Sequence, residues 1–343
     1  MSHATLQACA AALLATLPAA AFALDAQRAE VQDFLRQMQE RHGFSAEQLD
    51  PLFAQVESRP SILEAISRPA EKSKPWFEYR ALFLTDRRIE RGRATAQQQS
   101  EALQKAAATG VPAEVIVAIT GVETFYGEVT GKHRVIDALA TLAFDYPPRS
   151  AFFRGELEQF LIMSREEALD PLAPNGSYAG AMGVPQFMPS SYRNFAVDGD
   201  GDGRRDLWGS WSDVFASVAN YLGRHGWRAG EPVMVTADAT AADLSGLDLK
   251  TIELTENVGS LRRRGVRFET RLPDAAPAAL IELTGSAGPE YRVGFTNYYA
   301  ITRYNRSRMY ASAVNDLAQA IAGTAPQATP ATPPPFSSVS AAE

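Results

Sequence analysis

Apolar residues recur at helical spacing along most of the chain. In the segment AEVQDFLRQMQERHGF, an apolar residue falls every three or four positions and forms one stripe, made of Val31, Phe34, Leu35 and Met38. Five further stretches show the same period, the first with a cap at Ser45 and a break at Pro51. They predict helices over 45–56, 76–110, 150–169, 211–227 and 306–323.

The pattern changes from about residue 231. Short alternating or β-branched runs, such as EPVMVTA, LKTIELT, AALIELTG and EYRVGFTNYYAIT, lie between Gly, Pro and Asp breaks. They predict a small β domain over 231–297. Helix before and after it makes the predicted fold class α+β and predominantly helical.

The N-terminus has the character of an export signal. Its first 24 residues contain no Asp, Glu, Lys or Arg, and the apolar stretch ends in the small-x-small pattern Ala21-Phe22-Ala23. We expect cleavage after Ala23, although the segment lacks the usual basic residue. An uncleaved anchor and lipidation at Cys9 are the alternatives. Cys9 is the only cysteine of the chain. If the chain is cleaved after Ala23, the mature protein therefore contains no cysteine and no disulfide can stabilise it.

Net charge excludes one class of partner, and composition predicts a disordered tail. The formal net charge of −7 argues against a nucleic-acid partner bound through a positive field. The last residues, 323–343, are rich in Pro, Ala and Thr, and this composition predicts disorder.

A glutamate, Glu123, lies near the end of the strongly apolar segment VPAEVIVAITGVET. Pro112 suits the start of a helix there and Gly127 its end, and Glu123 borders the face formed by Ile116, Ile119, Val122 and Tyr126. Burial there would favour a protonated carboxyl, which a general acid for glycosidic cleavage needs. By pattern alone, an exposed glutamate at a helix end remains the alternative.

The stretch DGDGDGRRDLWGSWSD predicts a calcium loop. Carboxylates occupy positions one, three and five of an EF-hand pattern, at Asp198, Asp200 and Asp202. Arg204 would offer its carbonyl at position seven. Position twelve is Gly209 where a glutamate is usual, so Asp213 is the candidate that closes the site. We expect Ca²⁺ in a structural role, because the donors are hard oxygens; a solvated acidic turn is the alternative.

Five motifs together resemble one enzyme family. They are GVETFYG, DALATLAFDYPPR, GSYAGAMGVPQFMPSSYRNFAVDGDGDGRRDLW, ANYLGRHGW and ITRYNRSRMYASAV. In this order they resemble the membrane-bound lytic murein transglycosylase B family over about residues 28–322. The resemblance implies a lysozyme-like core, a helical domain, a small β domain and an atypical, lengthened EF-hand loop, which supports Asp213.

With the resemblance, the chain divides into six predicted segments. They are a signal peptide (1–23), an N-terminal helical domain (24–110), a lysozyme-like catalytic core with the EF-hand-like loop (111–230), the small β domain (231–297), a C-terminal part of the core (298–322) and the tail (323–343).

The resemblance also implies the reaction and its residues. The family cleaves the MurNAc-GlcNAc β-1,4 bond of peptidoglycan and forms 1,6-anhydro-MurNAc, and its catalytic glutamate falls on Glu123. Matching saccharide-cleft positions are Ser177, Gln186, Phe187, Tyr221, Tyr304, Asn305, Tyr310 and Arg149. The family often has two adjacent arginines where this chain has Pro148-Arg149, so that part of the cleft is less completely matched.

A single carboxylate suffices for this chemistry. Most glycosidases use two, but the resemblance implies that the C6 hydroxyl of MurNAc is the nucleophile, so we assign that role to neither Asp137 nor Asp145. A hydrolytic muramidase and a catalytically silent peptidoglycan- or calcium-binding protein are the competing functions.

The expected location and partners follow from export. We expect a periplasmic enzyme that acts on peptidoglycan glycan strands, and cell-wall synthases are a further candidate partner. Outer-membrane association is expected only if the chain is lipid-anchored.

Overall fold

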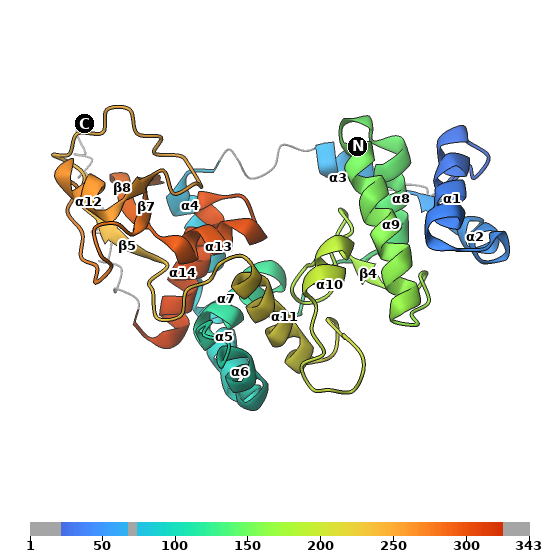
Figure 1. Ribbon diagram of the computed structural model, residues 1–343, viewed down its shortest axis with the longest axis horizontal. Coiled ribbons are helices and arrows are strands. Elements are labelled where there is room, and N and C mark those ends of the chain that lie inside the picture. The colour runs from blue at the N-terminus through green and yellow to red at the C-terminus, as the bar shows by residue number, and fades with distance from the viewer. Residues whose placement is uncertain (1–21, 68–73, 325–343) are drawn as a thin grey trace, which may run out of the picture. The chain divides into compact units, whose positions relative to one another are not determined.

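Helices outnumber strands over residues 22–67 and 74–324, which the computed structural model describes (Figure 1). The helices are α1 (Ala29–His42), α2 (Ala46–Phe53), α3 (Pro60–Ser67), α4 (Trp76–Phe83), α5 (Asp86–Gln98), α6 (Ser100–Ala107), α7 (Ala113–Thr124), α8 (Val135–Asp145), η2 (Pro147–Arg149), α9 (Ser150–Glu166), α10 (Pro189–Phe195), α11 (Trp211–Arg224), α12 (Val258–Arg263), α13 (Thr296–Tyr304) and α14 (Arg308–Ala322). The predicted, predominantly helical α+β class is confirmed.

The strands are short except for one hairpin. They are β1 (Phe22–Ala23), β2 (Glu57–Ser58), β3 (His133–Arg134), β4 (Asn175–Gly176), β5 (Met234–Ala237), β6 (Glu256–Asn257), β7 (Pro277–Gly285) and β8 (Gly288–Gly294). The four last form one antiparallel sheet in the order β5-β8-β7-β6. The strand predicted from LKTIELT, residues 249–255, is wrong: Leu249 O accepts one hydrogen bond from Glu282 N of β7, but the strand beside β7 is formed by Glu256 and Asn257.

The described part of the chain forms two compact units. Among the described residues, the first comprises 22–67, 131–182 and 186–193, and the second comprises 74–130, 183–185 and 194–324. The signal peptide up to residue 21, with Cys9, and the tail from residue 325 lie outside the described residues. The domain boundaries drawn from the sequence stay predictions.

The first unit is built on two long helices. α8 is buried from Val135 to Phe144, and α9 packs along it. The predicted break at Pro51 is wrong: α2 continues through it to Phe53, since Leu49 and Phe53 are four residues apart and both are buried.

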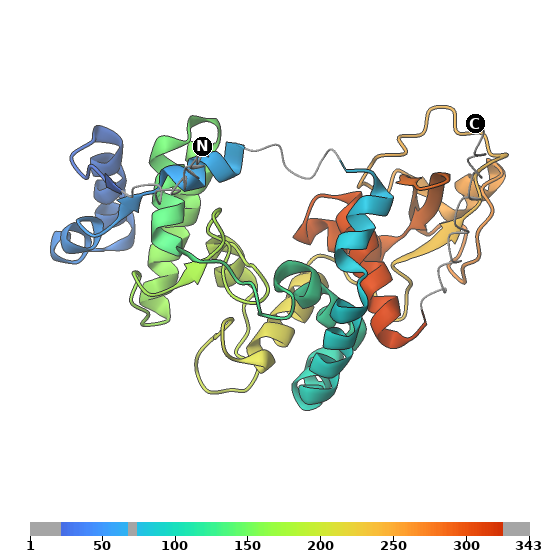
Figure 2. The same cartoon turned by 180° about the vertical axis from the view of Figure 1, so that it is seen from behind.

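The second unit surrounds α7. Helices α5, α6, α11 and α14 contact it, and Figure 2 shows α14 in red beside α4 and α5 in cyan. The single helix predicted over 76–110 is three helices. Leu84 leaves helical geometry, the Thr85 side chain accepts a hydrogen bond from Arg88 N and starts α5, and Gln99 separates α5 from α6.

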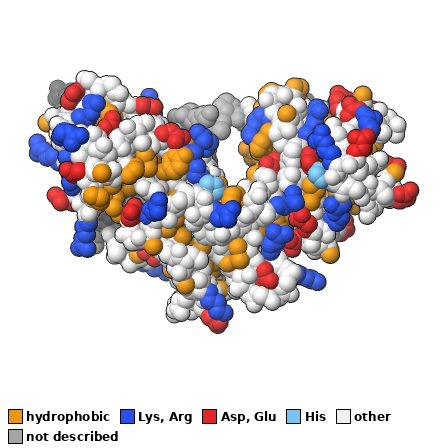
Figure 3. All heavy atoms as spheres, viewed as in Figure 1, with side chains coloured by type: hydrophobic (Ala, Val, Ile, Leu, Met, Phe, Trp, Pro, Cys, Tyr) orange, Lys and Arg blue, Asp and Glu red, His pale blue; other side chains and the backbone are white. Residues whose placement is uncertain are grey.

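The surface carries both signs of charge. On the face drawn in Figure 3, basic and acidic side chains are interspersed on each unit. Among the described residues, no helix combines the length and apolar character that crossing a bilayer requires.

Candidate active site

Glu123 is the penultimate residue of α7, a largely buried helix of the second unit. α7 buries every residue from Val115 to Gly121, and Glu123 itself is half-buried. Directly after the helix, Phe125, Tyr126 and Gly127 all adopt positive φ, at 52°, 59° and 85°. Two consecutive non-glycine residues in this region are strained, and such strain concentrates at functional sites.

Buried contacts hold this turn in place. Thr124 Oγ1 donates to Val184 O at 2.9 Å and accepts from Gly127 N at 3.0 Å. Tyr126 donates its hydroxyl to Arg88 O at 2.8 Å. A Cβ on Gly121 would come within 2.6 Å of the Tyr126 ring, so the glycine of GVETFYG makes room for this tyrosine. The role of Thr124 is not predictable from the sequence, because a threonine beside a glutamate carries no distinctive signal.

Tyr310 donates a hydrogen bond to Glu123. Ser307 caps α14 by accepting from Tyr310 N, and the Tyr310 hydroxyl lies 2.6 Å from Glu123 Oε1. Burial, and then the nearby Glu123 charge, raise the pKa of Tyr310 well above 10. The phenol is therefore a neutral donor at physiological pH.

Two more predicted tyrosines join this site. The Tyr304 ring lies almost parallel to Tyr310, with centroids 6.4 Å apart, and its hydroxyl donates to Pro185 O at 2.6 Å. Tyr221 on α11 packs against Tyr304 at 4.8 Å and donates to Arg303 O at 2.7 Å. Burial raises the pKa of Tyr221 to about 12. Asn305 follows Tyr304 as the exposed residue that ends α13.

The remaining cleft candidates belong to the first unit. Ser177 Oγ accepts from Ala179 N and Ala181 N at 3.3 and 3.1 Å, so it holds the turn of its own loop. Phe187 is buried and pairs its backbone with Met182, while Gln186 between them has φ of 53°. Arg149 lies over the Phe152 ring at 4.3 Å. The cleft roles of these residues stay predictions.

The acidic loop gathers three carboxylates. Oxygens of Asp198, Asp200 and Asp202 all lie within 4.8 Å of one another. Backbone hydrogen bonds, first from Gly203 N, lower the pKa of Asp198. Three hard oxygen donors at this separation fit Ca²⁺.

Asp213 organises the same loop from inside the protein. Its side chain is buried, with Oδ1 accepting from Gly199 N at 2.8 Å and Oδ2 from Asp206 N at 2.6 Å. Burial raises the pKa of Asp213. Arg204 is exposed, and its N–H donates to Asp202 Oδ1 at 2.8 Å. Direct binding of a cation by Asp213 and by the Arg204 carbonyl stays a prediction.

Comparison with known proteins identifies the family. The model for the transglycosylase SLT domain matches residues 26–319. Membrane-bound lytic murein transglycosylase B of Escherichia coli (strain K12) is 42% identical over 308 residues, which cover 87% of this chain and 84% of that protein.

Solved structures agree with this match. Lytic transglycosylase SltB1 of Pseudomonas aeruginosa has a TM-score of 0.82 at 50% identity, covering 86% of this chain and 98% of the other. Slt35 of Escherichia coli, in complex with calcium, has a TM-score of 0.80 at 40% identity, and the match covers 88% of this chain and 96% of that one. SltB3 of Pseudomonas aeruginosa, in complex with NAG-anhNAM-pentapeptide, has a TM-score of 0.75 at 35% identity, and the match covers 85% of this chain and 78% of that one. The resemblance predicted from the motifs is confirmed, and the chain belongs to the transglycosylase SLT domain family of lytic transglycosylases.

Proposed function

We propose that this lytic transglycosylase cleaves the MurNAc-GlcNAc β-1,4 bond of peptidoglycan, with Glu123 as acid and then as base. The observation that carries the proposal is the 2.6 Å hydrogen bond from the neutral Tyr310 hydroxyl to Glu123 on a strained turn. The murein named for the Escherichia coli relative and the anhydro-sugar named for SltB3 support the substrate and the product.

The reaction balances without water. The Glu123 carboxyl gives its proton to the glycosidic oxygen, the C1–O bond breaks, and its electron pair stays on the departing GlcNAc oxygen. The C6 hydroxyl of the same MurNAc then bonds to C1, and its proton passes to the Glu123 carboxylate. Because the nucleophile belongs to the substrate, holding the sugar in place supplies a large effective concentration.

Neighbouring side chains orient the groups that react. Tyr310 fixes the carboxyl through an always-protonated hydroxyl, so it can follow Glu123 through both protonation states. Tyr304 and Tyr221 pack beside Tyr310 and would form an aromatic wall of the proposed cleft. The Tyr221 ring is itself buried and stacks on His225 at 4.1 Å, so it would support Tyr304 from behind. Ser177, Gln186, Phe187, Asn305 and Arg149 complete the proposed saccharide cleft.

A second carboxylate is not required, and the candidates nearest in sequence to Glu123 have other partners. Asp137 is fully buried and accepts from Glu57 N and from the side chains of Arg59 and Arg134. Asp145 accepts from Arg28 and from the Ser58 hydroxyl. These contacts support a structural role for both.

Calcium would be held by the side chains of Asp198, Asp200 and Asp202, with the Arg204 carbonyl and Asp213 as further proposed ligands. The calcium named for Slt35 supports this assignment. When bound, the ion would neutralise the clustered carboxylates and stabilise the loop that leads into α11.

Export places the proposed reaction in the periplasm. The warrant is the uncharged apolar N-terminus ending in Ala21-Phe22-Ala23. N-terminal sequencing of protein recovered from cells tests it: a start at Leu24 supports cleavage, and an intact Met1 or an acylated Cys9 supports an anchor. Cell-wall synthases stay a proposed partner.

Product analysis tests the proposed reaction. Purified peptidoglycan is incubated with the enzyme, and the soluble fragments are weighed by mass spectrometry. Fragments ending in 1,6-anhydro-MurNAc support the proposal. Reducing ends, heavier by one water, would show a hydrolytic muramidase, and no release would show a binding protein.

A further inference from the structure

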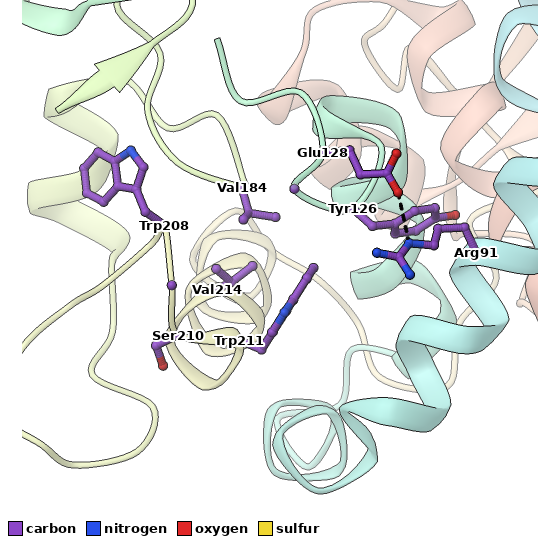
Figure 4. A pocket seen from close by; sticks show the side chains of 10 residues that line it. Arg91, Tyr126, Glu128, Val184, Trp208, Ser210, Trp211 and Val214 are labelled. Atoms are coloured by element: carbon purple, nitrogen blue, oxygen red, sulfur yellow. Dashed lines mark ion pairs between the residues drawn. The ribbon is translucent and has the colours of Figure 1, made fainter. Parts of the chain in front are cut away.

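A pocket of about 270 Å³ lies within the second unit, beside the turn that follows Glu123 (Figure 4). Tyr126, Gly127 and Glu128 come from that turn, Arg91 comes from α5, and Val184 and the residues around the start of α11 complete the lining. Neither Glu123 nor the tyrosines 221, 304 and 310 line it.

The pocket has a flat aromatic wall and an apolar floor. Trp211 opens α11, is half-buried, and packs against Phe215 at 5.1 Å. In Figure 4 its ring rises toward the side of Tyr126 and Arg91, whereas the Trp208 ring turns the other way. Tyr126 and Val214 also line the pocket and are almost completely buried. An indole face beside apolar side chains suits the C–H face of a pyranose ring.

An ion pair supplies the polar side. Arg91 Nε lies 3.2 Å from Glu128 Oε1, and both side chains remain about two-fifths exposed, at 42% and 38%. A sugar hydroxyl both donates and accepts hydrogen bonds, and this pair offers an acceptor and a donor side by side. An anionic peptide fits less well, because the Glu128 carboxylate would repel it.

The walls are held from outside the pocket. The Tyr126 hydroxyl is tied to Arg88 O, and Val184 N donates to Leu207 O at 2.8 Å. Ser210 Oγ donates to Asp200 Oδ2 at 2.9 Å, which links the rim to the acidic loop. A site held in this way is formed before its ligand arrives, so little ordering cost accompanies binding.

We propose that this pocket is an accessory sugar site that binds one N-acetylated pyranose of a glycan strand, separately from the cleavage cleft. The choice of sugar rests on the proposed function, since the strands are the substrate. The volume lies just below the roughly 300–1,000 Å³ of sites for drug-sized ligands, which suits a single ring.

The test uses the four tryptophans of the chain as reporters. The ¹⁵N-labelled protein is titrated with N-acetylglucosamine, and the indole N–H signals, assigned by single substitutions, are followed by NMR. We expect the Trp211 signal to move and saturate at millimolar sugar. Trp76 and Trp227 are internal references, because their indole N–H groups are bonded to Glu290 and to Gly110 O.

Two arginines on α5 give a matched pair of variants. Arg87 also pairs with Glu128, at 3.4 Å, but does not line the pocket. We expect Arg91→Ala to weaken the Trp211 response about tenfold, which corresponds to 1.4 kcal/mol, and Arg87→Ala to leave it unchanged. Should Arg91→Ala fail to fold, Arg91→Gln gives the same readout.

Three results would overturn the site: a Trp211 signal that does not move, an equal response in Arg91→Ala and wild type, or a response to alanyl-glutamate in place of the sugar. The titration needs no turnover, so it is independent of the proposed reaction. If the enzyme cleaves peptidoglycan but the Trp211 signal does not respond, only the proposal of an accessory site is refuted. If the Trp211 signal responds but no cleavage occurs, only the proposed reaction is refuted.

Discussion

Two carboxylates of the second unit, the half-buried Glu123 and the buried Asp316, have opposite kinds of partner: a neutral phenol and charged guanidinium groups. α14 supplies Tyr310, whose neutral hydroxyl donates to Glu123, and six residues later it supplies Asp316. Asp316 is bound by two guanidinium groups: Arg292 on β8 contacts both its oxygens, and Arg80 on α4 donates to Oδ2 at 2.8 Å.

The difference shows how partners decide what a carboxylate can do. Burial acts to raise the pKa of Asp316, but hydrogen bonds and charge from Arg292, and then Arg80, bring that pKa below its usual value. Because guanidinium groups stay charged, they hold Asp316 ionised and tie α4 and β8 to α14. The Tyr310 phenol is neutral and does not hold Glu123 in its ionised form by charge. Glu123 can therefore exchange a proton while the hydrogen bond keeps it oriented.

The largest expected effect is on the Glu123 side of this comparison. Glu123→Gln should lower turnover of purified peptidoglycan by at least the roughly 10²–10⁴-fold that acid–base groups supply, because an amide cannot give and retrieve the proton. The melting temperature should stay near that of wild type. Glu114→Gln, in the first turn of the same helix, is the control. Normal turnover in the Glu123 variant would end the assignment.

For the second carboxylate of the comparison, Asp316→Asn should lower the free energy of unfolding. Removing one partner of a buried ion pair costs about 3–5 kcal/mol, because the arginines are left without their counter-charge. Urea unfolding should show this loss, while turnover per folded molecule at low temperature stays close to wild type. Asp274→Asn, whose partner Arg262 and own side chain are both exposed, is the matched control and should change little. Equal losses in the two variants would contradict the argument.

The acidic loop is a third arrangement, in which carboxylates face one another. Calcium should raise the melting temperature relative to EDTA, with about 2.7 kcal/mol of stabilisation at a hundredfold excess over Kd. The double variant Asp200→Asn/Asp202→Asn should lose the calcium response. An equal response in both proteins would show that the loop is not the site. Folded enzyme that loses all activity in EDTA would show more than a structural role.

Replacing the neutral donor should have a moderate effect. Tyr310→Phe removes one hydrogen bond to Glu123 and should lower kcat about tenfold or somewhat more, since hydrogen bonds to charged groups contribute about 1.5–3 kcal/mol. Tyr298→Phe removes a hydroxyl bonded to Thr251 O in the same unit and should leave kcat unchanged. A kcat effect of the same size in both would reduce Tyr310 to a packing residue.

The smallest effect is on the pH dependence of stability. The pKa of Asp316 is lowered in the folded protein. Its contribution is therefore complete above about pH 4, the value of an unfolded aspartate, and is lost as the pH falls through the folded pKa. In Asp316→Asn, the decline in unfolding free energy below about pH 4 should become shallower. An identical acid limb in both proteins would contradict this assignment.

Local pattern was sufficient for part of the fold. Helical periodicity placed the stripe of α1, and the run AALIELTG placed β7, because each side chain there follows the period of its own element. The run EYRVGFTNYYAIT was predicted as strand, but only its start belongs to β8, and Thr296–Tyr304 form α13. Periodicity could not find the breaks at Leu84 and Gln99, since polar caps do not interrupt an apolar stripe.

The sequence by itself determined the family, through long motifs in a fixed order, and pointed to Glu123 and the acidic loop as sites of chemistry. Only the tertiary structure decided the partners: Tyr310, 187 residues from Glu123, donates to it, while Arg80, 236 residues from Asp316, pairs with that carboxylate. The pocket under Trp211 arose in the same way, from α5, the turn after α7 and the start of α11. The physical reason is that charge and hydrogen-bonding potential are local properties of a residue, whereas a pKa, an ion pair or a cavity depends on groups that only folding brings together.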